Sequence, residues 1–246
     1  MGWNEAFDRE ENRILLGMCT RNTIRMYGIG ALIWGIINLA LGFAAVKEAS
    51  INYILVAVSL GITITGISAV INPGLKLLFT ASIVTFVLWL WNIFVLFYNY
   101  STTGFVHFSL FGDVMTLVVA VSFFIQYKKL QFIQDIVTGI TGEQFKQTKK
   151  ICKALFKAKP KKFPNICAIS RPRGKVELRE DKAFFLEGMM LAAFLVNREE
   201  LRECIDDPSA KKYTVTILHP LKKKKYLFNK KYTGKIREWL GTENSE

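Results

Sequence analysis

Four long apolar stretches constrain this chain more than any other feature of its sequence. They cover residues 26–46, 51–71, 77–97 and 105–127. A helix needs about 20 residues to cross the roughly 30 Å hydrocarbon core of a bilayer, and each stretch is long enough. Asp113 is the single acidic residue within them. The sequence therefore predicts an integral membrane protein with a four-helix transmembrane domain over residues 26–127.

The connections between the predicted spans are short, and they set the orientation of the chain. Residues 47–50, 72–76 and 98–104 are too few for independent structure, so neighbouring spans are expected to run antiparallel. Cytoplasmic flanks of membrane helices carry an excess of Lys and Arg. Here those flanks hold Arg13, Arg21, Arg25, Lys76, Lys128 and Lys129. Both termini are therefore predicted to face the cytoplasm, with residues 1–25 forming an amphipathic cytosolic segment.

Charge is segregated along the chain. Residues 1–126 hold six basic and six acidic residues, so the remaining 27 basic and 14 acidic residues carry the whole net charge of +13. This pattern is typical of a membrane module joined to a strongly basic polar part. We divide that part into basic juxtamembrane helices and a linker over residues 128–162, and a small cytosolic α+β domain over residues 163–246.

The first predicted span has a stripe of small residues on one helical face. The stripe consists of Gly28, Ala31, Gly35, Asn38, Gly42 and Ala45. Steps of three and four residues keep these positions on one side of a helix. Small side chains let membrane helices approach closely. The stripe therefore predicts helix packing, and it also permits a homo-oligomer.

A polar layer is expected near the middle of the membrane domain. Asp113, Asn38 and Ser59 fall at similar depths if each helix rises 1.5 Å per residue. A charged side chain at mid-membrane costs roughly 2.5–3.5 kcal/mol on insertion scales, so such residues are usually interior. Two interpretations stay open: a proton or cation site with Asp113 as ligand, or a protonated Asp113 that hydrogen-bonds to its neighbours.

A basic amphipathic helix is predicted from about residue 143 to 158. Its polar side carries Lys146, Lys150, Lys153 and Lys157. Such a helix beside a membrane suits the anionic inner leaflet. Nucleic acid is a less favoured partner, because no base-stacking aromatic pattern or nucleic-acid motif accompanies the lysines. A simple positive anchor that binds no specific partner is the third interpretation.

The C-terminal domain is expected to contain mostly antiparallel strands with a closing helix. Short β-type runs cover residues 165–170, 175–179, 183–187, 190–196, 213–218 and 224–228. Helices are predicted over residues 197–205 and 231–240. The basic run is Lys222, Lys223, Lys224 and Lys225. It is interpreted as a solvated turn or as part of a site for a phosphate-containing partner.

The sequence offers no recognised catalytic or metal-binding motif. It contains no phosphate-binding loop, nucleophile elbow or H-E-x-x-H pattern. The four cysteines Cys19, Cys152, Cys167 and Cys204 form no C-x-x-C pair and are expected to be reduced. We therefore expect neither enzymatic activity nor a cofactor.

Two hypotheses for function follow. The first is a non-enzymatic membrane sensor or scaffold, whose basic cytosolic domain binds an anionic ligand or partner: a lipid headgroup, a nucleotide or an acidic protein. The alternative is a small oligomeric ion channel or proton-coupled carrier that uses Asp113 and is gated by the cytosolic domain.

Overall fold

The computed structural model describes residues 9–46, 53–104, 110–134, 141–188, 192–203, 214–219 and 222–241. The chain divides into two compact units. We call Met1–Thr20 together with Ile133–Glu246 the β unit, and Arg21–Phe132 the helical unit. Both divisions fall inside helices, so the chain passes between the units within α1 and again within α4.

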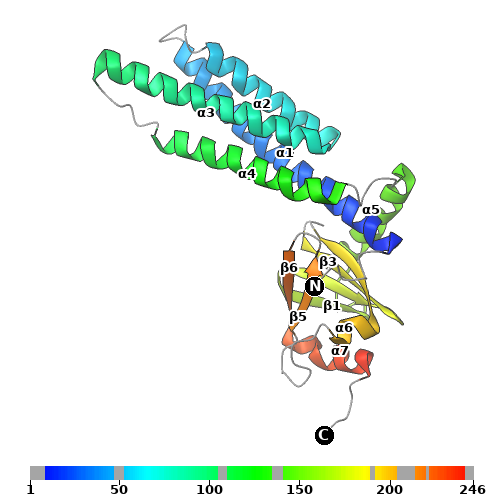
Figure 1. Ribbon diagram of the computed structural model, residues 1–246. Helices are drawn as coiled ribbons and strands as arrows, with labels where there is room; N and C mark the ends of the chain where they lie inside the picture. Colours follow the sequence, from blue (N-terminus) through cyan, green and yellow to red (C-terminus); the bar gives the residue numbers. More distant parts are fainter. Residues whose placement is uncertain are drawn as a thin grey trace. The chain divides into compact units, whose positions relative to one another are not determined.

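Four helices make up the first half of the described chain (Figure 1). They are α1 (Glu10–Val46), α2 (Tyr53–Ile71), α3 (Leu75–Thr103) and α4 (Leu110–Gln134). Three segments are long and apolar enough to cross a membrane: Glu10–Ala44, Tyr53–Ile71 and Leu75–Thr102. The fourth predicted span, 105–127, begins at residues that lie outside the described part of the chain.

The boundaries of two helices differ from the sequence-based expectation. Helix α1 begins at Glu10 and continues unbroken to Val46, so the expected amphipathic segment and the first span form one helix from residue 10 onward. Glu10 and Glu11 in the first turn suit the positive end of the helix dipole. Helix α3 extends through most of the expected third connection and ends where Gly104 adopts a left-handed conformation with φ of 68°.

Close packing of α1 against α2 involves the glycines of the small-residue stripe. A Cβ atom at Gly28 would lie 2.8 Å from Ala69 Cβ, and one at Gly42 would lie 3.0 Å from a methyl carbon of Val56. These pairings run in opposite directions along the two helices, which are therefore antiparallel. Ala31 is fully buried, whereas the side chain of Ala45 lies outside the described part. The two backbones approach closely because most of these positions lack bulk.

The β unit contains a curved six-stranded antiparallel sheet (Figure 1). Its strands are β1 (Ile166–Arg171), β2 (Gly174–Leu178), β3 (Lys182–Glu187), β4 (Ala193–Asn197), β5 (Thr214–His219) and β6 (Lys222–Phe228). They are ordered β4-β3-β2-β1-β6-β5. Three helices accompany the sheet: α5 (Gly142–Lys157), α6 (Arg198–Glu203) and α7 (Thr233–Leu240). The prediction of a mostly antiparallel domain with a closing helix is confirmed.

Side chains on both faces of the sheet are buried. On one face, Phe185 stacks on Phe194 with ring centroids 4.9 Å apart, and Leu201 from α6 and Ile236 from α7 belong to the same core. The other face supplies a second core, whose strand residues are Ile166, Phe184, Leu186, Ala193 and Leu195. Its cover comes from Leu15, Met18 and Cys19 on α1 and from Cys152 and Leu155 on α5. The β unit therefore joins segments from both ends of the chain.

The basic run of residues 222–225 forms the start of β6, so its interpretation as a turn is wrong. Lys222 pairs with His219 and Lys224 pairs with Ile217 of β5. Successive side chains in a strand point to opposite faces, so the four lysines do not form one patch. Lys225 is exposed, while the side chains of Lys222, Lys223 and Lys224 lie outside the described part.

The glycine packing generates the first prediction. A Cβ at Gly35 would lie 2.4 Å from Thr63 Oγ1 and 2.7 Å from the Thr63 backbone nitrogen, whereas one at Gly30 would meet nothing within 4 Å. Gly35→Ala should lower the free energy of unfolding by about 1–3 kcal/mol, the usual cost of overpacking. Gly30→Ala should leave it unchanged or raise it, because alanine favours helix. Thermal unfolding of both full-length variants in mild detergent measures the difference, and equal stability would contradict the close packing of α1 and α2.

Candidate functional site

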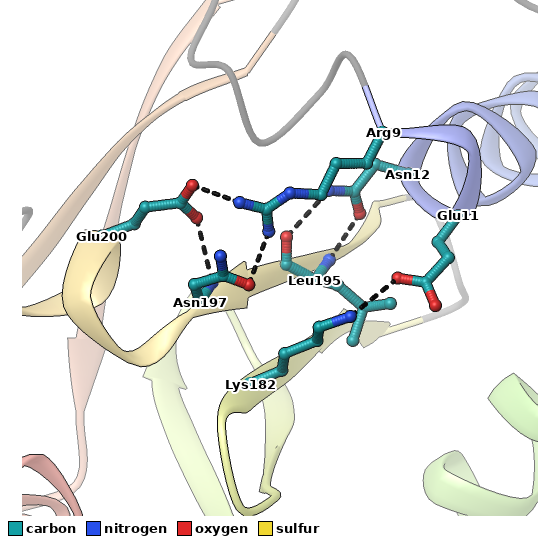
Figure 2. Close-up of polar contacts among 7 residues, drawn as sticks. All are labelled: Arg9, Glu11, Asn12, Lys182, Leu195, Asn197 and Glu200. Atoms are coloured by element: carbon teal, nitrogen blue, oxygen red, sulfur yellow. Dashed lines mark hydrogen bonds and ion pairs between the residues drawn. The ribbon is translucent and has the colours of Figure 1, made fainter.

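The candidate site is the surface of the β unit on which the beginning of α1 docks. Figure 2 shows the polar contacts of Arg9, Glu11 and Asn12 with β3, β4 and α6. All of these residues belong to the β unit. We call this contact the docking site.

Asn12 binds the backbone of the edge strand. Its side chain is fully buried. Its Nδ2 donates to the carbonyl oxygen of Leu195 at 2.8 Å, and the Leu195 N–H donates back to Asn12 Oδ1 at 2.6 Å (Figure 2). Strand β4 is the last strand on its side of the sheet. The amide of Asn12 thus occupies the place of a strand neighbour, and it satisfies two backbone groups that are costly to bury unpaired.

Two ion pairs flank this contact. Arg9 forms a salt bridge with Glu200, and its Nη1 donates to Asn197 Oδ1 at 2.7 Å. Glu200 also accepts the backbone N–H of Asn197 at 3.0 Å, so it caps the start of α6. The second pair joins Lys182 Nζ to Glu11 Oε2 at 3.4 Å and is more exposed. It contributes less, because water screens exposed pairs.

A partly open cavity of about 180 Å³ lies beside the docking site. Its walls come from α1, α5 and strands β3 and β4, with one residue that follows β2. The lining residues are Glu11, Ile14, Leu15, Thr148, Ile151, Arg179, Phe184 and Leu195. The Arg179 guanidinium lies 5.4 Å from the centre of the Phe184 ring and pairs with Glu177 at 3.0 Å. The cavity is thus mainly apolar, and its charged groups are already paired.

Helix α5 is held at both of its ends. Thr141 caps the N-terminus through a reciprocal capping box with Gln144. At the C-terminus, the amine of Lys175 on β2 donates to the carbonyl oxygens of Phe156 and Ala158. Burial lowers the pKa of Lys175 below its ordinary value. These contacts, together with the buried Cys152 and Leu155, fix which face of α5 points outward from the β unit.

The outward face of α5 is basic, with apolar side chains at its margins. The lysines predicted for the polar side, Lys146, Lys150, Lys153 and Lys157, are all exposed. Ile151 and Phe156 are exposed by 52% and 47%, and Phe163 in the following turn by 48%. Three exposed large apolar side chains thus lie on α5 or just beyond it, among the exposed lysines. We call this surface the α5 face.

The predicted polar residues of the helical unit are all buried. Asn38 is 8% exposed, Ser59 is fully buried, and Asp113 is 4% exposed. Asn38 Nδ2 donates to the carbonyl oxygen of Trp34 at 2.8 Å in its own helix. Ser59 Oγ has no hydrogen-bond partner among the described residues.

The sequence did not predict the residues of the docking site. Asn12 lies in a charged N-terminal segment, where a polar side chain is expected to be solvated. The available signal was the apolar cluster Leu15, Leu16, Met18 and Cys19 that follows it. Four such residues within five positions indicate a buried helix, but not the surface that buries it.

Burial raises the pKa of several ionisable groups of the β unit. It raises the pKa of Cys152 to about 12 and that of Cys167 to about 11. Both thiols, and the buried Cys19, are free of disulfides. The Tyr226 hydroxyl donates to Glu187 Oε1 at 2.8 Å, and burial together with this carboxyl group raises the pKa of Tyr226. At neutral pH the thiols of Cys152 and Cys167 and the hydroxyl of Tyr226 are therefore protonated. Cys204 lies outside the described part.

Comparison with known proteins finds no match: no protein-family model, no curated protein and no solved structure is similar to the chain.

The docking site generates the second prediction. Asn12→Ala removes the side chain that hydrogen-bonds to the N–H and C=O of Leu195. Leaving buried groups without a hydrogen-bond partner lowers the free energy of unfolding by about 1–3 kcal/mol. Hydrogen exchange of the Leu195 amide should therefore become about tenfold faster or more, while the Val176 amide in β2 stays protected. Glu10→Ala is the matched control, because Glu10 is exposed and, among the described residues, has a hydrogen bond only with Gln144, at 3.4 Å. Unchanged exchange at Leu195 in Asn12→Ala would show that α1 does not dock on β4.

Proposed function

We propose that this protein is a non-enzymatic, multi-pass membrane sensor or scaffold whose cytosolic β unit binds anionic lipid headgroups through the α5 face. The observation that carries the proposal is the α5 face itself: exposed lysines on one side of a helix, bordered by Ile151 and Phe156. Lysines alone suit many anions. Exposed large apolar side chains beside them favour the interface of a bilayer, where both kinds of side chain are stabilised.

Under this proposal, α1 to α4 form a four-helix bundle in the membrane, and both termini lie in the cytoplasm. Three of these helices have segments that are long and apolar enough to span, and the fourth carries Lys128 and Lys129 towards its C-terminal end. The positive flanks support this orientation. On this topology, residues that follow α4 emerge on the anionic cytoplasmic side, so the α5 face starts close to a surface of opposite charge.

The docking site supplies a route by which lipid contact reaches the membrane helices. Residues 10–20 of α1 belong to the β unit, and the same helix continues into the first span. Helix α5 contributes to the same core as those residues, through Cys152 and Leu155. A displacement of α5 at the membrane surface therefore changes the packing around Leu15 and Met18. In this scheme the sensed quantity is the anionic lipid content of the cytoplasmic leaflet.

The test compares full-length protein in nanodiscs of zwitterionic lipid with protein in nanodiscs that also contain phosphatidylserine. Amide hydrogen exchange in residues 150–157 should slow in the anionic discs. Replacing Lys150, Lys153 and Lys157 by Gln should remove this effect, because each Lys near an anionic surface contributes about 1 kcal/mol. High salt should weaken the effect in the unmodified protein.

The matched control removes the same number of charges elsewhere on the β unit. Arg171, Arg173 and Lys231 are exposed and lie on other elements, so their replacement by Gln should preserve the lipid-dependent protection. Phe156→Glu is a second probe: it should weaken protection even though every lysine remains. If the control triple reduced protection as strongly as the α5 triple, the effect would be one of net charge, and the α5 face would not be the lipid site.

A further inference from the structure

Each helix of the helical unit buries polar side chains. Among them are Asn38 on α1, Ser59 on α2, Thr85 on α3, and Asp113 and Thr116 on α4, with Asp113 in the first turn of its helix. None is more than 8% exposed. We call these five residues the polar layer, and the packing of the helices shows that they lie at one depth.

The contacts of α1 with α2 place Asn38 and Ser59 side by side in depth. Gly35 packs against Thr63, and the two helices are antiparallel. Asn38 is about one turn beyond Gly35, and Ser59 is about one turn before Thr63. Both steps lead in the same direction along the bundle, so these two residues are level.

The remaining contacts bring α3 and α4 to the same depth. Gly61 on α2 faces Val84 on α3, which places the next residue, Thr85, within about one turn of Ser59. On α4, Ala120 accepts a hydrogen bond from Ser82 of α3 at 2.9 Å, and the rings of Tyr127 and Phe79 meet with centroids 5.0 Å apart, so α3 and α4 are antiparallel. Thr116 lies about one turn before Ala120, and Thr85 lies about one turn after Ser82, so Thr116 and Thr85 are level.

An independent contact between α1 and α4 gives the same answer. The rings of Tyr27 and Phe123 meet with centroids 5.9 Å apart. Asp113 lies ten residues from Phe123, and Asn38 lies eleven residues from Tyr27, in the same direction along the bundle. Asp113 and Asn38 are thus at one level, and the two routes through the helices agree within about one turn.

Several groups at or near this layer have hydrogen-bonding capacity that the described residues do not use. Among the described residues, the buried hydroxyls of Ser59 and Thr85 have no hydrogen-bond partner, and neither do the indole N–H groups of Trp34 and Trp91, which lie within two turns of the layer. An unsatisfied polar group in a bilayer core costs several kcal/mol. A bound polar species at this depth would supply contacts that these buried groups lack among the described residues.

We propose that the polar layer is a binding site for one monovalent cation, either a proton carried on ordered water or a sodium ion. The donor atoms are oxygens, which hard cations prefer. A single carboxylate, Asp113, balances one positive charge, whereas a divalent ion would leave a net charge in the membrane interior. The inference rests on the proposed membrane location of the helices. It does not depend on lipid binding by the α5 face.

The described parts of the helices carry few ionisable groups near the layer. In the described parts of the helices packed around it, the ionisable groups closest to the layer are Tyr27 on α1, Tyr53 on α2, Lys76 on α3 and Tyr127 on α4. Each lies several residues away, towards a helix end.

The experiment measures thermal unfolding of the full-length protein in nanodiscs. One series exchanges choline for sodium at constant ionic strength, and the other lowers the pH from 8 to 5 without sodium. A ligand that binds only the folded state raises its stability with concentration. We expect one of the two series to stabilise the unmodified protein, and Asp113→Asn to lose that response. Stabilisation by sodium identifies a sodium site, and stabilisation by acid alone identifies a proton site.

Two milder variants keep the test decisive if Asp113→Asn does not fold. Ser59→Ala and Thr85→Val retain the carboxyl group and should raise the half-saturating cation concentration about tenfold, the equivalent of about 1.4 kcal/mol. Thr80→Val, which removes an exposed hydroxyl from the same helix as Thr85, should change nothing. Equal responses in the unmodified protein and in all of these variants would overturn the cation site. Lipid-dependent protection of α5 would still stand in that case, so the two proposals fail separately.

Discussion

The β unit depends on the covering of the second face of its sheet. Strand β3 buries residues on both sides, with Phe185 in one core and Phe184 in the other. Helices α6 and α7 cover the first core from within the C-terminal part of the chain. The second core needs Leu15 and Met18 from the opposite end of the sequence. Without these residues of α1, the apolar side chains of the second core would be exposed and would favour aggregation. The start of α1 is therefore a structural part of the β unit.

This dependence explains why the polar contacts of α1 are so specific. Apolar packing alone does not fix the position of a helix along a sheet, since it is non-directional. Asn12 fixes it, because its amide matches the N–H and C=O of Leu195 on the open edge of β4. The same contact covers an edge that would otherwise offer itself for pairing with another chain. Arg9 extends the contact to Glu200, and thus to the start of α6.

Local sequence patterns predicted much of the fold, and the failures have physical causes. Alternation located most strands of the C-terminal domain within a few residues, and periodicity located α5. The lysine run was misread as a turn, because like charges repel each other; β6 tolerates it since neighbouring side chains point to opposite faces.

The docking site escaped prediction because Asn12 and Leu195 are separated by 183 positions. No local pattern shows which distant strand edge a buried amide will meet. The similar depths of Asn38, Ser59 and Asp113 were predicted from the rise of a helix alone. The depth of Thr85 could be assigned only from the packing of α3.

The packing of α1 also bears on how a cation site would be built. The small-residue stripe of α1 predicted helix packing and permitted a homo-oligomer. However, Gly28, Gly35 and Gly42 are already in close contact with α2, and Gly66 of α2 faces the α1 backbone. A second copy could use that stripe only by displacing α2. The close approach of these two backbones instead places Asn38 and Ser59 at one depth on neighbouring helices of a single chain. The oxygen atoms proposed to hold the cation therefore come from one copy, and the site requires no pore formed between subunits.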